Sequence, residues 1–196
     1  MNSEKDYVII CEDKRLNKFG GIVMDFIEKS LKKSILFKNL ADEEIKIIAK
    51  KVEKTLFKKG KAIVVEGEMS DCIFILLRGN ARVSTRLEQY EIFLSELEPS
   101  AIIGEITLVD RKPISADVVA TEACLIGKIA HKALEAIMVQ NPAIAVKIWE
   151  GIACILSHRI RKSNEMMRNY FGINKAICNN SEFREFFSFC YYGPRE

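Results

Sequence analysis

The strongest constraint on the fold is a series of short β-rich runs, which begins after Gly60 and ends near Ala130. The runs occupy residues 62–65, 72–77, 82–87, 91–97, 117–120 and 123–130. Glycine, aspartate and proline turns separate them, as at Gly67, Gly79 and Pro99. Closely spaced short strands of this kind predict a small closed or double-sheet β architecture. Long helices do not alternate with the strands, which argues against a parallel α/β sheet.

Helical periodicity surrounds this β-rich region. Apolar spacing predicts a helix over 22–31 and a second one that follows the turn at 37–40 and reaches Lys54. After the strands, we expect a short helix over 131–140 and a long helix that begins after Pro142 and ends at Gly172. The expected fold class is therefore mainly β with flanking helices: a jelly-roll-like β-roll with N-terminal helices and a long C-terminal helix.

This pattern predicts four parts of the chain. They are an N-terminal arm and helix (1–35), the β-roll (36–141), the long C-terminal helix (142–170) and an aromatic-rich tail (171–196). Phe183, Phe186 and Phe187 make the tail too apolar to stay in water. We expect the tail to dock on the body or on a partner; a lid over a ligand pocket is the alternative.

Composition excludes several classes of protein. The 196 residues are 48% hydrophobic and carry a net charge of +3, with acidic and basic residues mixed, so no general footprint for nucleic acid is present. No apolar run reaches the roughly 18 residues of a membrane helix, and the first residues do not resemble a signal peptide. The six cysteines are scattered, which favours free thiols and a cytoplasmic location.

Residues 103–118, which we call the cassette, carry the clearest binding signal. Gly104 and Glu105 open a short amphipathic turn, and Pro113 is followed by the small residues Ser115 and Ala116. A glycine before helix-compatible residues directs free backbone N–H groups toward an anion. Small residues after the proline allow a ligand to approach the backbone. The cassette is therefore a candidate phosphate cradle.

The cassette and its surroundings resemble the cyclic-nucleotide-binding domain family over residues 36–169. The resemblance rests on four fragments that precede the cassette in family-like order and spacing. They are Leu36-Phe37-x-x-Leu40, Gly60-x-x-Ile63-x-x-x-Gly67-Glu68, Asp71-x-Ile73-Phe74-Ile75-x-x-x-Gly79 and Leu94-x-x-Leu97-x-Pro99. Each fragment is weak alone, and the ordered set is strong.

The resemblance implies a ligand site for cyclic AMP or cyclic GMP and no other cofactor or metal. Glu105 would accept a hydrogen bond from the ribose 2′-hydroxyl. Backbone groups around Gly104 and Thr107, with Ser115 and Ala116, would meet the cyclic phosphate. Ile106 and Ile114 occupy the cassette positions beside them and are also expected at the ligand site. Val83, Leu94 and Ser95 match strand positions that line the base, and Ser163 and Asn164 match positions on the long helix that reach it.

Ile114 departs from the family pattern, which has arginine at this position. A guanidinium makes a forked, charge-assisted pair with phosphate that no other side chain reproduces. Arg111 and Lys112 stand two and three residues upstream and would have to reach over to compensate. A milder departure is Ser100, where the family usually has glycine after the proline.

Two functions remain open from the sequence. The first is a non-catalytic regulatory sensor that binds cyclic nucleotide weakly, or takes a different small ligand in the β-roll pocket. Retention of Glu105 favours a polar ligand, although a carboxylate that only caps backbone N–H groups would explain it too. The second is a β-roll without a ligand that acts as a dimerisation or protein-docking scaffold.

A stripe on the long helix bears on the second function. It repeats every three or four residues, which is the heptad spacing of a helix–helix seam, for example in a homodimer. Its members are Trp149, Ala153, Leu156, Ile160, Ser163, Met167 and Tyr170. The alternative is a face packed on the protein's own β-roll.

Two further functions are disfavoured by the sequence. The segment after Tyr170 is too short and too aromatic for a helix-turn-helix domain, so we expect no direct contact with nucleic acid. His131 and His158 are the only histidines, and both fall in expected helices, so a cupin-type metal site is not expected. With no Walker loop and no Gly-x-Ser-x-Gly, we expect no enzymatic activity.

Overall fold

The computed structural model describes residues 20–88 and 90–179. The N-terminal arm and the aromatic tail therefore lie outside the described residues. The chain divides into two compact units, of which one ends at Cys154 and the other begins at Ile155. Every strand and the cassette belong to the first unit.

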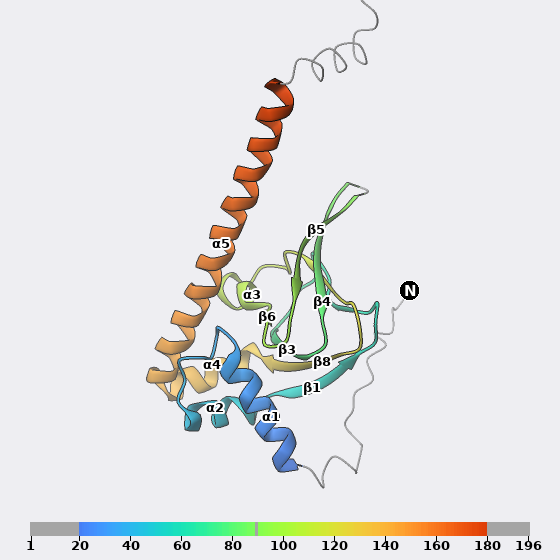
Figure 1. Ribbon diagram of the computed structural model, residues 1–196. Coiled ribbons are helices and arrows are strands. Elements are labelled where there is room, and N and C mark those ends of the chain that lie inside the picture. The colour runs from blue at the N-terminus through green and yellow to red at the C-terminus, as the bar shows by residue number, and fades with distance from the viewer. Residues whose placement is uncertain (1–19, 89, 180–196) are drawn as a thin grey trace, which may run out of the picture. The chain divides into compact units, whose positions relative to one another are not determined.

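Two four-stranded antiparallel sheets form the body of the first unit (Figure 1). One sheet has the order β1 (Glu53–Phe57), β8 (Cys124–Ala130), β3 (Cys72–Arg78) and β6 (Ile102–Ile103). The other has the order β2 (Ala62–Val64), β7 (Asp117–Ala120), β4 (Ala81–Leu87) and β5 (Tyr90–Leu97). The β-roll expected from the sequence is confirmed.

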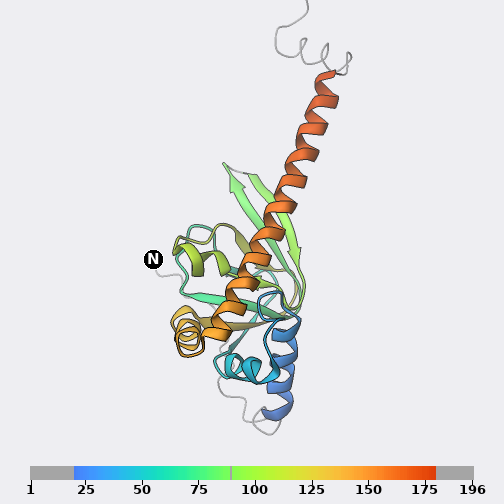
Figure 2. The same ribbon diagram turned by 90° about the vertical axis from the view of Figure 1, so that its left-hand side faces the viewer.

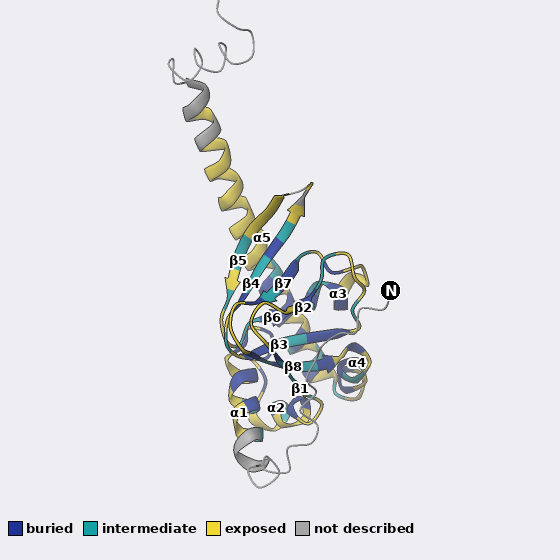
Figure 3. Cartoon of the chain, turned by 90° about the vertical axis from the view of Figure 1, so that its right-hand side faces the viewer, coloured by how far each residue is buried: buried dark blue, intermediate teal, exposed yellow. Residues whose placement is uncertain are grey.

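Strand β3 shows why the sequence folds in this way. Its side chains alternate between the two faces of the sheet, and both faces are covered, so it reads as a nearly continuous apolar run. Leu76 lies in the core between the sheets with Phe57, Ile126 and Val118. Helices α1 (Gly20–Lys33), α2 (Asp42–Ala49) and α4 (His131–Gln140) lie together beside the β1–β8–β3–β6 sheet (Figure 2) and turn their buried sides inward (Figure 3).

Helix α5 (Pro142–Asn179) is anchored to the first unit by its first turns. Ile144, Ile148 and Ile152, four residues apart, are buried. The Lys147 Nζ atom lies 2.7 Å from the Glu44 carboxylate on α2. The spacing of these groups places them on one face of the helix, which is the face that packs on the first unit.

Three details of the sequence-based prediction were wrong or missing. The second helix ends at Ala49 instead of reaching Lys54, because residues 53–57 pair with β8 as strand β1. Helix α5 does not end at Gly172 but continues to Asn179. Strand β6 was not expected, since a two-residue strand produces no periodicity.

Candidate ligand-binding site

The cassette is built around Gly104 and the short helix α3 (Glu105–Asp110). Gly104 has φ 84°, a left-handed conformation that glycine adopts without cost. A Cβ at this position would lie 2.8 Å from the Cys72 carbonyl oxygen, so the close approach also requires glycine. The Thr107 hydroxyl donates a hydrogen bond of 2.7 Å to the Gly104 carbonyl and closes the turn.

Glu105, the expected ribose partner, is fully buried at the first position of α3. A carboxylate at a helix N-terminus is favoured by the helix dipole. Glu105 has an interaction partner within the structure, so its burial alone does not require a ligand. Its buried position is therefore compatible with both roles expected from the sequence, a partner of the ribose and a cap of backbone N–H groups.

Ile114 lies where the resemblance implies a phosphate-binding arginine. Its side chain is 7% exposed and belongs to the core cluster between the sheets. Its backbone is held from both sides, because Ile114 N donates to Glu68 O at 2.9 Å and Gly67 N donates to Ile114 O at 2.8 Å. The position therefore presents an apolar side chain to the interior of the β-roll.

Arg111, the nearest upstream cation, is engaged elsewhere. Its guanidinium lies 3.0 Å from Nδ1 of His131 and also pairs with Glu135, both on α4. Because arginine has no acceptor, His131 must accept this bond at Nδ1 and carry its proton at Nε2. Burial, and then the positive charge of Arg111, lower the pKa of His131. Lys112 is exposed, and its backbone N–H donates to Asp110.

Seven further predicted site residues fall into three groups. Val83 on β4 is in register with Ser95 on β5, and Leu94 precedes Ser95 in the chain. All three residues are partly buried. Ser115 is exposed and Ala116 is partly buried where the cassette leads into β7. Ser163 and Asn164 are exposed on α5 in the unit that begins at Ile155.

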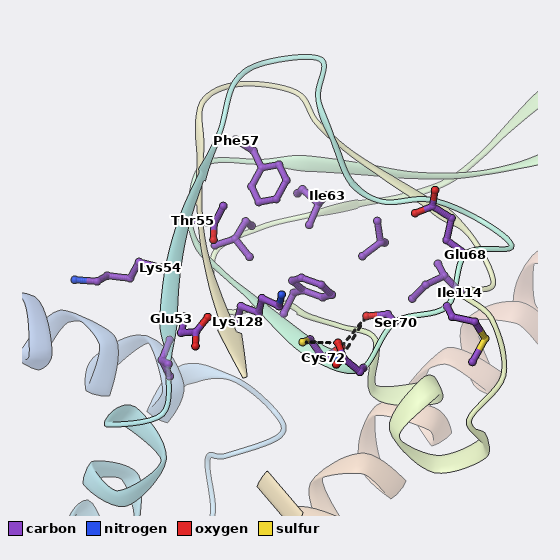
Figure 4. Close-up of a pocket in the computed structure, with 16 residues that line it drawn as sticks. Glu53, Lys54, Thr55, Phe57, Ile63, Glu68, Ser70, Cys72, Ile114 and Lys128 are labelled. Carbon is purple, nitrogen blue, oxygen red and sulfur yellow. Dashed lines mark hydrogen bonds between the residues drawn. The ribbon is translucent and has the colours of Figure 1, made fainter. Parts of the chain in front are cut away.

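A cavity of about 600 Å³ opens between the two sheets near β1 and the turn over 66–71 (Figure 4). Of the predicted site residues, Ile114 alone lines it. Its other apolar walls include Phe57, Ile63, Phe74 and Ile126. The sequence-based prediction missed the contribution of β1 to this wall, Phe57, because the start of β1 was assigned to the end of a helix.

The opposite end of the cavity is polar. Asp71, Cys72 and Lys128 line it, together with Ser70 and Glu53. The Cys72 thiol donates a hydrogen bond of 3.1 Å to Asp71 Oδ1, which lowers the pKa of that carboxyl. Burial, and then the hydrogen bond to Asp71, raise the pKa of Cys72 to about 12. Cys72 is thus a neutral donor at ordinary pH and not a nucleophile.

No helix within residues 20–88 and 90–179 is long and apolar enough to cross a membrane. In the same segments, no group of three or more histidine, cysteine, aspartate or glutamate residues is placed to hold a metal ion.

Residues 54–141 match the family model described as the cyclic nucleotide-binding domain. Among curated proteins, the chain is 27% identical over 135 residues to the cyclic AMP receptor protein of Thermus thermophilus, covering 68% of this chain and 61% of that one. It is 22% identical over 139 residues to a CRP-like cAMP-activated global transcriptional regulator of Mycobacterium tuberculosis, covering 70% and 60%. The chain thus spans about three fifths of the length of these relatives.

Solved structures show the same fold. The catabolite activator protein of Thermus thermophilus is similar with a TM-score of 0.62 and 25% identity, over 70% of this chain and 63% of that one. A cyclic nucleotide-binding domain from Methylobacillus flagellatus is similar with a TM-score of 0.68 and 20% identity, over 79% and 85%. The first unit therefore has the β-roll fold of cyclic nucleotide-binding domains, and residues 54–141 are similar in sequence to that family.

Proposed function

We propose that the chain is a non-catalytic regulatory sensor that binds a small ligand inside the β-roll, and that cyclic AMP and cyclic GMP bind it only weakly. The observation that carries the proposal is Ile114, an apolar side chain buried in the core at the position where the resemblance implies an arginine. The names of the relatives support a cyclic nucleotide as the ligand to test first.

The size of the effect follows from the charge pair that Ile114 does not make. Removing one partner of a buried charge pair costs about 2–5 kcal/mol. This cost corresponds to a loss in affinity of roughly 30-fold to several thousand-fold. A site that would otherwise bind in the micromolar range would thus bind in the millimolar range. Arg111 does not compensate in this structure, because its guanidinium pairs with His131 and Glu135 on α4.

The test is a calorimetric titration of cyclic AMP into the wild type, Ile114→Arg and Ile114→Met. Ile114→Arg should bind at least about tenfold more tightly, because it restores the forked phosphate partner. The cavity beside Ile114 provides room for the longer side chain. Ile114→Met changes the shape but adds no charge, and it should bind like the wild type. A folded Ile114→Arg protein with no gain would contradict the proposal.

A scaffold without a ligand is the second candidate, and exposed apolar residues on α5 favour it. Ile160, Met167 and Tyr170 of the heptad stripe are 60%, 54% and 64% exposed. Thermal stabilisation by cyclic AMP distinguishes the two functions, since only a ligand that prefers the native state raises the melting temperature. A dimer that forms whether or not a ligand is present would favour the scaffold.

A further inference from the structure

The cavity next to Ile114 separates its polar and apolar groups along the strands. On β8, Cys124 and Ile126 face the core between the sheets, and alternation places Lys128 on the same face. Lys128 is in register with Glu53 on β1 and with Phe74 on β3, whereas Phe57 is in register with Cys124 further along. Figure 4 shows Lys128 and Cys72 at one end of the cavity and Phe57 and Ile63 at the other.

Lys128 brings a cation into this enclosed space. Its side chain is only partly exposed, and its charge acts on Asp71 and Cys72 by lowering their pKa values, although burial outweighs this effect at Cys72. Among the described residues, no carboxylate lies within ion-pair distance of the Lys128 ammonium. An ammonium in a partly dry pocket gains from an anionic partner more than one in water does.

The carboxylates that line the cavity do not fill this role. Glu53 and Glu68 are exposed to solvent, which screens their charge. Asp71 is also exposed, and its carboxylate accepts the hydrogen bond from the Cys72 thiol. Of the two lysines that line the cavity, Lys54 points away from it in Figure 4, so the charge that faces the apolar walls is that of Lys128.

We propose that this cavity binds an apolar carboxylic acid, with the carboxylate on Lys128 and the hydrocarbon part against Phe57, Ile63, Phe74 and Ile126. The volume of about 600 Å³ suits a small organic ligand. The two phenylalanine side chains favour a flat or aromatic body, which packs well on aromatic rings. This inference rests on the proposed sensor function and names the class of its alternative ligand.

Ile114 connects this cavity with the cassette. The residue lines the cavity, and its backbone is bonded to residues 67 and 68 of the turn beside it. A ligand in contact with Ile114 therefore acts on the part of the cassette that leads into β7.

The test uses three probes that share one hydrocarbon body and differ in the charge of the head group: phenylbutyrate, phenylbutanol and phenylbutylamine. Calorimetric titration of the wild-type protein should give an affinity for the acid at least about tenfold above those for the alcohol and the amine, because only the acid pairs with Lys128. The comparison needs no variant, so it does not depend on whether a substitution folds.

Two variants test whether the preference for the acid comes from the Lys128 side chain. Lys128→Met removes the ammonium but keeps the length of the side chain, and it should bind acid and alcohol about equally. Lys132→Met, an exposed lysine on α4 that does not line the cavity, should retain the preference of the wild type. The proposal is overturned if the alcohol or the amine binds the wild type as tightly as the acid, if Lys128→Met keeps the preference, or if no probe binds.

The cyclic AMP titration of Ile114→Arg distinguishes a failure of the carboxylic-acid inference from a failure of the proposed sensor function. If the variant gains affinity for cyclic AMP while the acid does not bind the wild type, the carboxylic-acid inference fails and the sensor function stands. If neither binding is observed, both fail.

Discussion

At the scale of single residues, Arg111 illustrates how a charge is directed away from the site that its sequence position suggests. It ends α3 with φ 57°, a left-handed conformation. From there its guanidinium reaches His131 and Glu135 on α4 rather than the cassette. These two contacts of Arg111 connect the cassette helix with the helix that follows the β-roll, and one of them is made to a buried histidine.

His131 should make the stability of the protein depend on pH. Burial lowers its pKa in the folded state, with Arg111 lowering it further and Asp71 raising it, so the unfolded chain binds the proton more tightly. Acidification through about pH 6.5, the ordinary histidine range, therefore favours unfolding, and this destabilisation is absent above that range. His131→Asn keeps an acceptor for Arg111 but does not titrate. Its melting temperature should fall less than that of the wild type between about pH 7.5 and about pH 5.5.

The measurement is the difference between the wild type and His131→Asn in how the melting temperature depends on pH. The comparison is needed because other titrating groups contribute to the pH dependence of both proteins. Parallel curves would show that His131 does not contribute to the pH dependence.

Ser100 carries a backbone strain that the sequence already indicated. It has φ 79°, which explains why glycine is usual at this position in the family that the chain resembles. A left-handed conformation costs a residue with a side chain roughly 1–2 kcal/mol, while glycine loses more chain entropy on folding, by about 0.5–1 kcal/mol. Ser100→Gly should therefore leave the free energy of unfolding unchanged or raise it by about 1 kcal/mol.

Chemical denaturation measures this change, and Ala101→Gly is the matched control. Ala101 does not have a positive φ, so the substitution should lower stability by about 0.5–1 kcal/mol. A loss of stability in Ser100→Gly as large as that in the control would show that the strain is not relieved.

At the scale of elements, the anchoring of α5 depends on a close approach at Gly151. A Cβ at this position would lie 2.4 Å from the Leu36 carbonyl oxygen, which is backbone and does not move aside easily. The helix therefore packs directly against the chain that follows α1. A second contact is the pair between Lys147 and Glu44, which holds α5 to α2 and lowers the pKa of Glu44.

Gly151→Ala should destabilise the protein although alanine is the better helix former. The helix propensity gains about 1 kcal/mol, but overpacking against the Leu36 backbone costs typically 1–3 kcal/mol and more when backbone must move. We expect a lower melting temperature and a lower free energy of unfolding. Gly172→Ala on the same helix has nothing within 4 Å of the added Cβ, so it should be neutral or slightly stabilising. Equal behaviour of the two variants would refute the close packing at Gly151.

Most elements could be predicted from the sequence, and the exceptions have identifiable causes. The strands from β2 to β8 other than β6 have alternating or continuous apolar runs between turn residues, which is a local signal. Residues 53–57 lack such a signal, because only one of the five is fully buried, and their strand exists through pairing with β8. Gly172 has no conformation that ends a helix, so α5 continues past it.

At the scale of the whole molecule, the stripe on α5 is the feature that predicts a partner helix. Ile160, Met167 and Tyr170 of this stripe are more than half exposed, and Met166 and Phe171 beside them are also exposed. Apolar residues that repeat at heptad spacing favour a seam with a second helix. A second copy of the chain would present the same stripe.

Ile160→Glu should convert a dimer into a monomer, because a charge at the centre of such a seam would be buried without a partner. Multi-angle light scattering measures the mass in solution, and circular dichroism shows that the fold is retained. His158→Glu introduces the same charge two residues away, off the stripe, and should leave the mass unchanged. A wild type that is already monomeric, or a dimer that survives Ile160→Glu, would exclude the seam.

The sequence by itself determined the β-roll, the order of its elements other than β1 and β6, and the position of the cassette, because these depend on local periodicity, on turn residues and on the spacing of short motifs. Only the tertiary structure decided what surrounds Ile114, where Arg111 points and which residues line the cavity. These features depend on strand pairing and on the packing of α4 against the sheet, which bring together residues far apart in the chain. The cassette could thus be recognised from the sequence, whereas the cation of the cavity, Lys128, required the register of β1, β8 and β3.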